Sequence, residues 1–204
     1  MYANASRRGR SMLGLAAAFC ALVAASPDAR ADDEFDFKLV RTRGLPPTCA
    51  PHAWAKAELE TLGFAEKLKI TVKGFKPGTP LVLFALQVPN QPFGIGWYLA
   101  DLEVGRDGSV TKTVVTRLNN ETFAVAIGPA KAPKPHGDRD GGSNPVFKPV
   151  HTFHLGIWFD SVEAGAANGC PGGPTPFNGD HTAVIQVLNT GNFADKQGPL
   201  RRID

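Results

Sequence analysis

The sequence predicts an all-β protein, an immunoglobulin-like β-sandwich of about eight or nine strands. Hydrophobic residues recur at every second position through most of the chain, which is the spacing of strands with one buried face. Segments rich in Gly, Pro and Asp separate these runs, and the Asp107-Gly108 pair is a strong hairpin signal. A series of short strands with such turns is typical of a sandwich.

The strands follow from this alternation in order along the chain. Residues 35–39 and 67–73 alternate apolar with mostly charged side chains. Residues 81–88 are nearly all apolar, which predicts a central strand covered on both faces. A strand at residues 151–159 places Phe153, Leu155, Ile157 and Phe159 on one face. Further strands are expected at residues 97–102, 110–116, 122–127 and 182–188.

Residues 53–61 fit two structures. Alanines and a leucine alternate with Trp54, Lys56 and two glutamates, which favours a strand. Ala, Lys, Glu and Leu are also good helix formers, so a helix is the alternative. We favour the strand because it would pair with residues 67–73 across a short loop.

One short helix is expected at residues 160–169. Asp160 and Glu163 have the spacing of a capping box, and Gly169 suits the C-terminal end of a helix. Residues 128–150 and 171–180 are rich in Gly and Pro and have no periodicity, which predicts two long loops.

Residues 1–31 have the pattern of a secretory signal peptide. Arginines precede an apolar run at residues 12–25, and Ala29-Arg30-Ala31 places small residues at the two positions that a signal peptidase reads. The apolar run is too short to span a bilayer comfortably, and no stop-transfer pattern follows it. We therefore expect a single domain at residues 32–204, in a secreted or periplasmic protein with no transmembrane segment after cleavage.

The composition of residues 32–204 narrows the classes of function. Without the leader, basic and acidic residues are equal in number, so no long-range attraction to nucleic acid is expected. Both methionines, Met1 and Met12, lie in the leader, which argues against a copper carrier with thioether ligands. Cys49 and Cys170 are the two remaining cysteines, and export favours a disulfide between them over two free buried thiols.

Several segments of the chain share a pattern with known proteins. They are QVPN at 87–90, PFG at 92–94, WY at 97–98, HTFHLGIWF at 151–159, GCP at 169–171, TPFNG at 175–179 and GPL at 198–200. Together they resemble a family of secreted bacterial proteins to which no activity is assigned. The resemblance implies export and an all-β domain, and it implies no activity.

Histidines provide the only candidate metal ligands of note. His151 and His154 are three residues apart on an expected strand, so they point to opposite faces. A site made of His154, Asp160 and His181 depends on an assumed pairing of the last two strands. No close His/Cys cluster supports it, and ordinary structural histidines are the favoured interpretation.

Catalytic motifs are equally sparse. The chain has no Gly-x-Ser-x-Gly elbow and no Gly-rich phosphate loop followed by Lys-Ser/Thr. Asp101 and Glu103 share a strand face, but nothing pairs them with a carboxylate across a cleft, as a glycosidase needs. We expect no catalytic residue, no cofactor and no metal.

Aromatic residues form the remaining candidate site. Phe93, Trp97, Tyr98 and Trp158 are the candidate ligand contacts, together with His154, Asp160 and His181. On a strand, Trp97 and Tyr98 point to opposite faces. The alternative that we favour is that Trp97 and Trp158 belong to the core.

These observations favour a secreted, non-enzymatic protein that binds a protein or glycan partner or contributes to the cell envelope. A carbohydrate- or small-ligand-binding module is the first alternative, and a metal-dependent or hydrolytic enzyme is the second. A flat, exposed aromatic strip would favour the binding module. A close cluster of His154, Asp160 and His181 in a concave pocket would favour the enzyme, and neither feature would favour a structural role.

Overall fold

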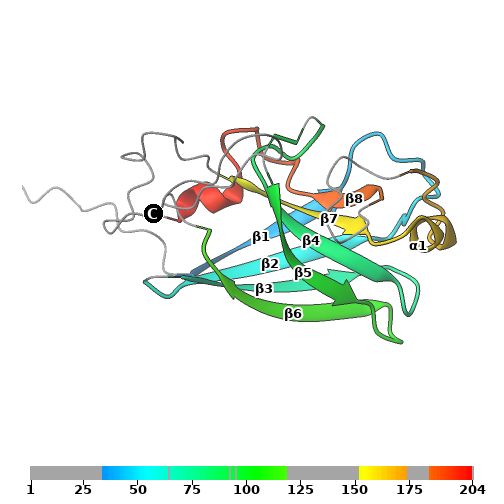
Figure 1. Ribbon diagram of the computed structural model, residues 1–204, viewed down its shortest axis with the longest axis horizontal. Coiled ribbons are helices and arrows are strands. Elements are labelled where there is room, and N and C mark those ends of the chain that lie inside the picture. The colour runs from blue at the N-terminus through cyan, green and yellow to red at the C-terminus, as the bar shows by residue number, and fades with distance from the viewer. Residues whose placement is uncertain are drawn as a thin grey trace, which may run out of the picture. The chain divides into compact units, whose positions relative to one another are not determined.

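A computed structural model describes residues 34–63, 65–91, 93, 94, 96–118, 152–173 and 184–203. Within these residues, eight antiparallel strands form one sheet that nearly closes on itself, with one short α-helix and one 3-10 turn (Figure 1). The prediction of an all-β protein is confirmed. The elements are β1 (Glu34–Arg41), β2 (Trp54–Thr61), β3 (Glu66–Lys73), β4 (Pro80–Leu86), β5 (Gly96–Glu103), β6 (Ser109–Thr116), β7 (His154–Phe159), α1 (Val162–Ala167), β8 (Gln186–Asn189) and η2 (Pro199–Arg202).

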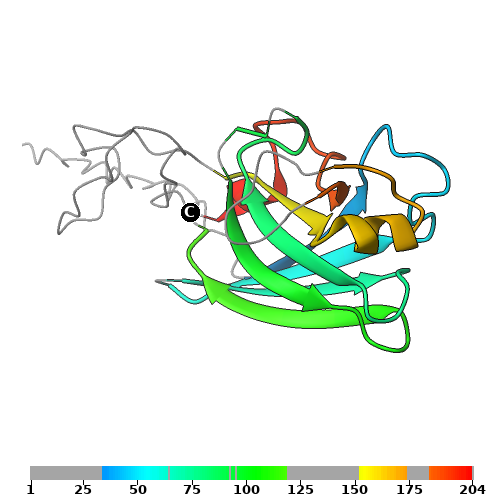
Figure 2. The same cartoon turned by 45° about the vertical axis from the view of Figure 1, so that its right-hand side comes forward.

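The strand order β5-β4-β7-β8-β1-β2-β3-β6 divides the sheet into two halves. The β5–β4–β7–β8 half and the β1–β2–β3–β6 half meet where β1 pairs with β8 over only two positions, at Val40 and Arg41. The turn at residues 104–108 joins the two terminal strands, β5 and β6 (Figure 2). The sheet is therefore continuous through β1 and β8, and an immunoglobulin-like arrangement of two separate sheets stays a prediction.

The main core lies between the inner faces of the two halves. Strands β1, β2 and β3 alternate strictly between buried and more exposed residues, as their sequences predict. Their buried positions join residues of β4, β5 and β7 in one hydrophobic cluster. The largest fully buried members of this cluster are Leu39, Leu59, Leu68, Ile70, Leu81, Leu83, Leu102, Leu155, Ile157 and Phe159.

A second, smaller core covers the outer face of β4 and β7. Every residue of β7 is buried, and so is every residue of β4 after Pro80, which confirms the prediction of a central strand covered on both faces. The strand ends at Leu86 rather than at Val88. The second cluster consists of Val82, Phe84, Leu86, Phe93 and Trp158.

Residues 53–61 form β2, so the strand alternative is confirmed. The strand pairs with β3 without a break, from Trp54 opposite Lys73 to Thr61 opposite Glu66. A chain reversal at Gly63, whose φ of 85° suits glycine, brings the two strands together. Pairing with β3 therefore stabilises a strand in a segment whose composition also allows a helix.

The predicted helix at residues 160–169 forms as α1, with a different N-cap. The Ser161 hydroxyl accepts a hydrogen bond from the Ala164 amide at 3.1 Å, whereas the capping box expected at Asp160 and Glu163 does not form. Ser161 has the extended backbone of an N-cap, so Asp160 precedes the cap and Glu163 lies inside the first turn. Gly169 follows the helix with a φ of 73°.

Several predicted segments lie outside the described residues. They are the leader at 1–31, the strand at 122–127, the loop at 128–150, the start of the strand at 182–188 and most of the loop at 171–180. In the part of the chain that the structure describes, no helix has the length and apolar character needed to cross a bilayer.

Candidate functional site

The predicted disulfide between Cys49 and Cys170 is present and fully buried. It ties the segment between β1 and β2 to the segment after α1, across 121 positions of sequence. Arg41 supports the first of these segments, because its Nη2 donates to the carbonyl oxygens of Pro46 and Cys49, each at 2.9 Å. Both sulfur atoms therefore have a structural role, and neither is a free nucleophile.

His154 is a fully buried member of a hydrogen-bond network. Its Nε2 lies 2.8 Å from the carbonyl oxygen of Asp195, which can only accept, so Nε2 carries the proton. Nδ1 then accepts from the Thr190 hydroxyl at 2.9 Å. Burial lowers the pKa of His154, so the ring is neutral at pH 7 and both of its nitrogens are already engaged.

The structure places His154 and Asp160, two of the three residues of the metal hypothesis, far apart. His154 begins β7 and Asp160 follows its end, so six residues of extended chain at about 3.3 Å each place them about 20 Å apart. One metal ion cannot bind both, because its ligands lie within about 2.6 Å of it. His181 lies outside the described residues. Among the residues that the structure describes, no three His, Cys, Asp or Glu side chains converge to hold a metal ion.

The predicted aromatic platform is mostly buried. On the outer face of the β5–β4–β7–β8 half, Phe93 packs edge-on against Trp158 at 5.2 Å between ring centroids, and Trp158 packs likewise against Phe84 at 5.3 Å. Phe84 contacts Tyr98 at 6.1 Å, and only Tyr98 is appreciably exposed, at 39%. Trp97 pairs with Ala85 and packs against the main core instead. These rings form a covered row rather than an exposed strip.

Tyr98, the exposed member of this row, lies close enough to Asp101 and Asp160 for both carboxylates to affect its pKa. Partial burial and a hydrogen bond to the Asp101 carboxylate raise the pKa of Tyr98, and the charge of Asp160 adds to the effect. The Tyr98 hydroxyl is therefore protonated at neutral pH and donates to Asp101. This edge of the molecule offers acidic groups beside one ring.

The opposite half carries an exposed tryptophan that sequence reasoning had not singled out. Trp54 lies on the outer face of β2 and is 42% exposed. The Lys73 ammonium sits over its ring, 5.7 Å from the centroid, and the register aligns Trp54, Lys73 and Ser109 across three strands. The signal was present in the alternation of residues 53–61, which puts Trp54 on the same face as Lys56.

Residues that are in register across β1, β2, β3 and β6 form rows on this outer face, and charge is distributed unevenly among these rows. The row next to Trp54 holds Lys38, Lys56, Thr71 and Thr111, and the two rows beyond it hold all four acidic residues of the face: Glu34, Asp36, Glu58 and Glu60. We define the Trp54 face as the two rows that contain no acid, which consist of Lys38, Trp54, Lys56, Thr71, Lys73, Ser109 and Thr111.

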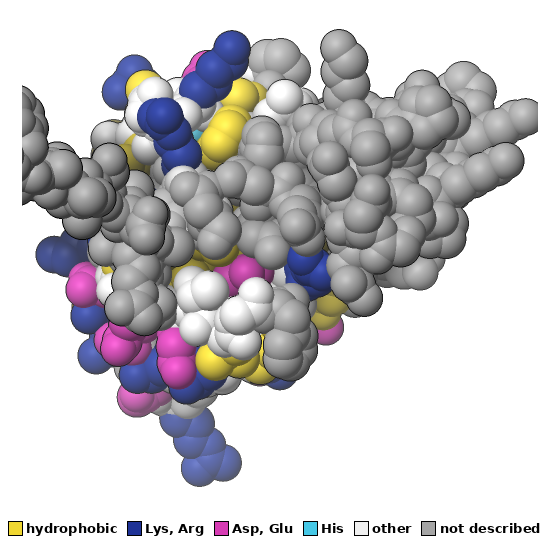
Figure 3. Space-filling model, turned by 90° about the vertical axis from the view of Figure 1, so that its left-hand side faces the viewer, with side chains coloured by type: hydrophobic (Ala, Val, Ile, Leu, Met, Phe, Trp, Pro, Cys, Tyr) yellow, Lys and Arg dark blue, Asp and Glu magenta, His cyan; other side chains and the backbone are white. Residues whose placement is uncertain are grey.

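Ion pairs neutralise most of the charge beyond the Trp54 face. Lys67 lies 2.6 Å from Glu60, and Lys69 lies 2.7 Å from Glu58. Lys56 reaches away from Trp54 to Glu58 at 3.1 Å, with Asp36 at 3.5 Å. Figure 3 shows basic and acidic side chains interleaved at its lower left. Such exposed pairs contribute little to stability, but they fix where charge is cancelled.

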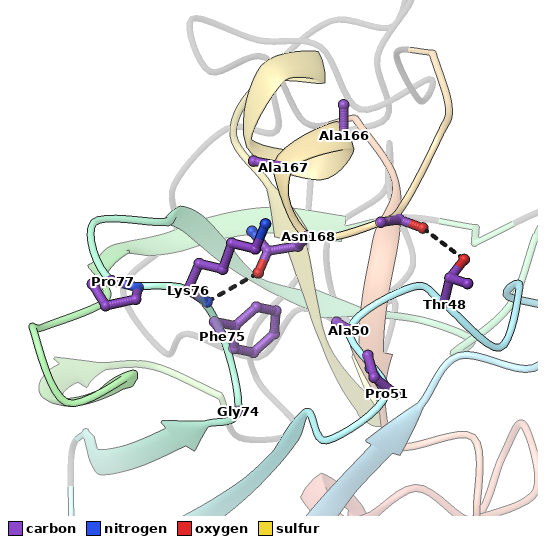
Figure 4. Close-up of a pocket in the computed structure, with 11 residues that line it drawn as sticks. Thr48, Ala50, Pro51, Gly74, Phe75, Lys76, Pro77, Ala166, Ala167 and Asn168 are labelled. Atoms are coloured by element: carbon purple, nitrogen blue, oxygen red, sulfur yellow. Dashed lines mark hydrogen bonds between the residues drawn. The ribbon is translucent and has the colours of Figure 1, made fainter.

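A cavity of about 600 Å³ lies beneath the C-terminal end of α1 (Figure 4). The Asn168 side chain accepts from the Lys76 amide at 3.0 Å and donates to the Thr79 hydroxyl at 3.0 Å. Thr48 donates to the Gly169 carbonyl at 3.3 Å. The polar side chains of Thr48 and Asn168 are thus used to join three backbone segments, and Lys76 is the one charged residue among those that line the cavity.

No protein-family model matches this sequence, and no curated protein matches it.

Proposed function

We propose that the protein is an exported, non-enzymatic β domain that binds a partner in the cell envelope through the Trp54 face. The observation that carries the proposal is the exposed indole of Trp54, which lies beside lysines and threonines on the outer face and is the largest exposed apolar side chain among the described residues. Burying a large apolar side chain stabilises a protein by about 1.5–3 kcal/mol, and Trp54, which is 42% exposed, forgoes part of that gain in the free protein. A bound partner would recover it.

The chemistry of Trp54 and its neighbours supports a binding role. Tryptophan is enriched among the residues that dominate binding energy, where removal of the side chain typically costs about 2 kcal/mol or more. The ring is held in place by β2 and by Lys73, so little conformational freedom is lost when a partner packs against it.

The geometry of the other candidates favours binding over catalysis. Both nitrogens of His154 are hydrogen-bonded, the two cysteines form a disulfide, and Asn168 is engaged on both its oxygen and its nitrogen. A hydrolase or a metal enzyme built on these residues would first have to break the contacts that hold the fold.

Export is part of the proposal. The disulfide is compatible with an oxidising compartment. Cleavage after Ala31 predicts a mature protein that begins at Asp32, and N-terminal sequencing of the protein recovered from the periplasm or medium tests this directly. A mature protein that retains Met1 would contradict export by this route.

Binding is tested by co-sedimentation of the mature protein with cell envelopes from the exporting bacterium. The wild type should sediment with the envelopes in a saturable manner, and Trp54→Ala should bind at least tenfold more weakly. Tyr98→Ala, which removes the exposed ring of the opposite half, is the matched control and should bind like the wild type. Equal binding by the wild type and Trp54→Ala would contradict the proposal, as would a wild type that stays in solution.

A further inference from the structure

The Trp54 face has a positive charge that its own neighbours leave uncancelled. Its three lysines are Lys38, Lys56 and Lys73, and its two rows contain no acid. Lys56 is turned toward Asp36 and Glu58, in the next row. The charge of Lys73 acts on Asp107, whose carboxylate is engaged by the amide and hydroxyl of Ser109 at 3.1 and 2.6 Å. Lys38 and Lys73 are therefore available to an anionic partner.

The spacing of Lys38 and Lys73 favours a partner with repeated charges. They lie two strands apart and two residues apart along the strands, because Lys38 is in register with Thr71 through Lys56. With about 4.8 Å between strands and about 3.4 Å per residue, their Cα atoms are separated by about 12 Å. At this spacing each lysine can pair with its own carboxylate, and successive acidic units of a polymer supply such a series.

The groups between the two lysines suit sugars. Thr71 and Thr111 present adjacent hydroxyls, 3.0 Å apart, that donate and accept hydrogen bonds. Trp54 presents an apolar ring surface with a negative face, against which the C–H side of a sugar ring can pack. Lysine pairs with carboxylates as a point charge without demanding a fixed fork geometry, which suits a polymer that can shift along the face.

We infer that the partner at the Trp54 face is an acidic polysaccharide, with a sugar ring packed against Trp54 and carboxylates of successive units paired with Lys38 and Lys73. This inference rests on the proposed function and specifies its ligand. A nucleic acid also combines repeated charge with stacking rings. Successive bases of a nucleic acid stack on several aromatic side chains, whereas the Trp54 face offers one ring, which favours the sugar polymer.

The test is calorimetric titration of the mature protein with polygalacturonate and with the same polymer fully methyl-esterified, which removes the charge and keeps the sugar. Polygalacturonate should bind in a saturable manner, esterification should weaken binding at least tenfold, and 0.5 M NaCl should do the same because it screens the charges. Trp54→Ala and the double variant Lys38→Gln/Lys73→Gln should each weaken binding about tenfold or more. Lys67→Gln, which removes a lysine already paired with Glu60 two rows away, is the matched control and should bind normally.

The outcomes separate the inference from the proposed function. Equal binding of the charged and esterified polymers would overturn the inference, and so would full binding by the double lysine variant. Tighter binding of oligothymidylate than of polygalacturonate would overturn it in favour of a nucleic acid. If polygalacturonate does not bind while Trp54-dependent co-sedimentation with envelopes persists, the inference fails and the proposed function stands. If both are absent, both fail.

Discussion

The two halves of the sheet use their outer faces in opposite ways. On the β5–β4–β7–β8 half, Trp158 lies on the outer face with none of its surface exposed, packed between Phe84 and Phe93. On the β1–β2–β3–β6 half, Trp54 also lies on the outer face, and 42% of its surface is exposed among lysines and threonines. The same residue type is a core residue in one half and a surface residue in the other.

The difference arises from what covers each face. The segment after β4 carries Phe93 onto Trp158, and the Asn189 side chain anchors that segment by donating to the Pro89 carbonyl at 2.9 Å. On the outer face of β2, Trp54 has the Lys73 ammonium over its ring and no such aromatic cover in the described part of the chain. The connecting segments therefore determine the role of an aromatic residue on a strand as much as the strand does.

Removing the disulfide should have the largest effect, because it ties the chain of one half to the chain of the other. Closing a loop of 121 positions stabilises the folded state by about 4–5 kcal/mol on the chain-entropy relation. Cys170→Ser should therefore lower the free energy of unfolding in urea by about that amount. Cys49→Ser should match it, and the double variant should be no worse than either, whereas a loss below about 1 kcal/mol would show that the bond adds little.

Truncation of Trp158, the covered tryptophan, should cause the next largest loss of stability. Trp158→Ala removes a fully buried ring that contacts Phe84 and Phe93, and such substitutions cost about 3–5 kcal/mol. Urea unfolding, followed by far-ultraviolet circular dichroism, measures the loss. A change below about 1 kcal/mol would mean that the second core contributes little to folding and would remove the contrast between the two faces.

Acid should lower the free energy of unfolding through His154, which begins β7. Burial lowers the pKa of His154 below its ordinary value of about 6.5, so on acidification the unfolded chain takes up a proton before the folded protein does. The stability that depends on the neutral ring is complete above pH 6.5 and is lost as pH falls below it, by at most about 1.4 kcal/mol per pH unit. Urea unfolding between pH 7.5 and 5 should show this slope. His154→Gln should make the free energy of unfolding depend less on pH. His52→Gln, at an exposed position, is the control and should leave the slope unchanged. Equal slopes for the wild type and both variants would assign the acid sensitivity to other groups.

Truncation of the exposed tryptophan should have the smallest effect on stability. Trp54→Ala removes a ring that is already partly hydrated, so the free energy of unfolding should change by about 1 kcal/mol or less. The same urea titration measures it beside Trp158→Ala. A loss as large as that of Trp158→Ala would show that Trp54 is structural and would remove the main support for the proposed function.

Much of the fold could be predicted from local patterns, because most strands bury one face. The alternation of β1, β2 and β3, the two-sided burial of β4 and the pairing of Cys49 with Cys170 all follow from residue type and spacing. The N-cap could not be predicted in the same way, because Asp160 and Ser161 are both good capping residues. The backbone conformation after β7 determines that Ser161 is the cap.

The candidate site was harder to predict. Trp54, Trp97 and Trp158 all occur on strands, and their exposure depends on which half covers them. A bulge between Leu83 and Phe84 also shifts the register of β5, so the positions of its rings cannot be read from alternation alone. The separation of His154 from Asp160, by contrast, follows from strand geometry and was available in the sequence.

Oxidative footprinting of the three tryptophans in the mature protein, read by mass spectrometry with and without envelopes, tests whether Trp54 is the ring that contacts the partner. In the free protein, Trp54 should be oxidised much faster than Trp158, with Trp97 between them, because that is the order of their exposure. Envelope binding should protect Trp54 selectively. Bound protein in which Trp54 reacts as fast as in solution, with protection confined to Tyr98 or elsewhere, would contradict the account.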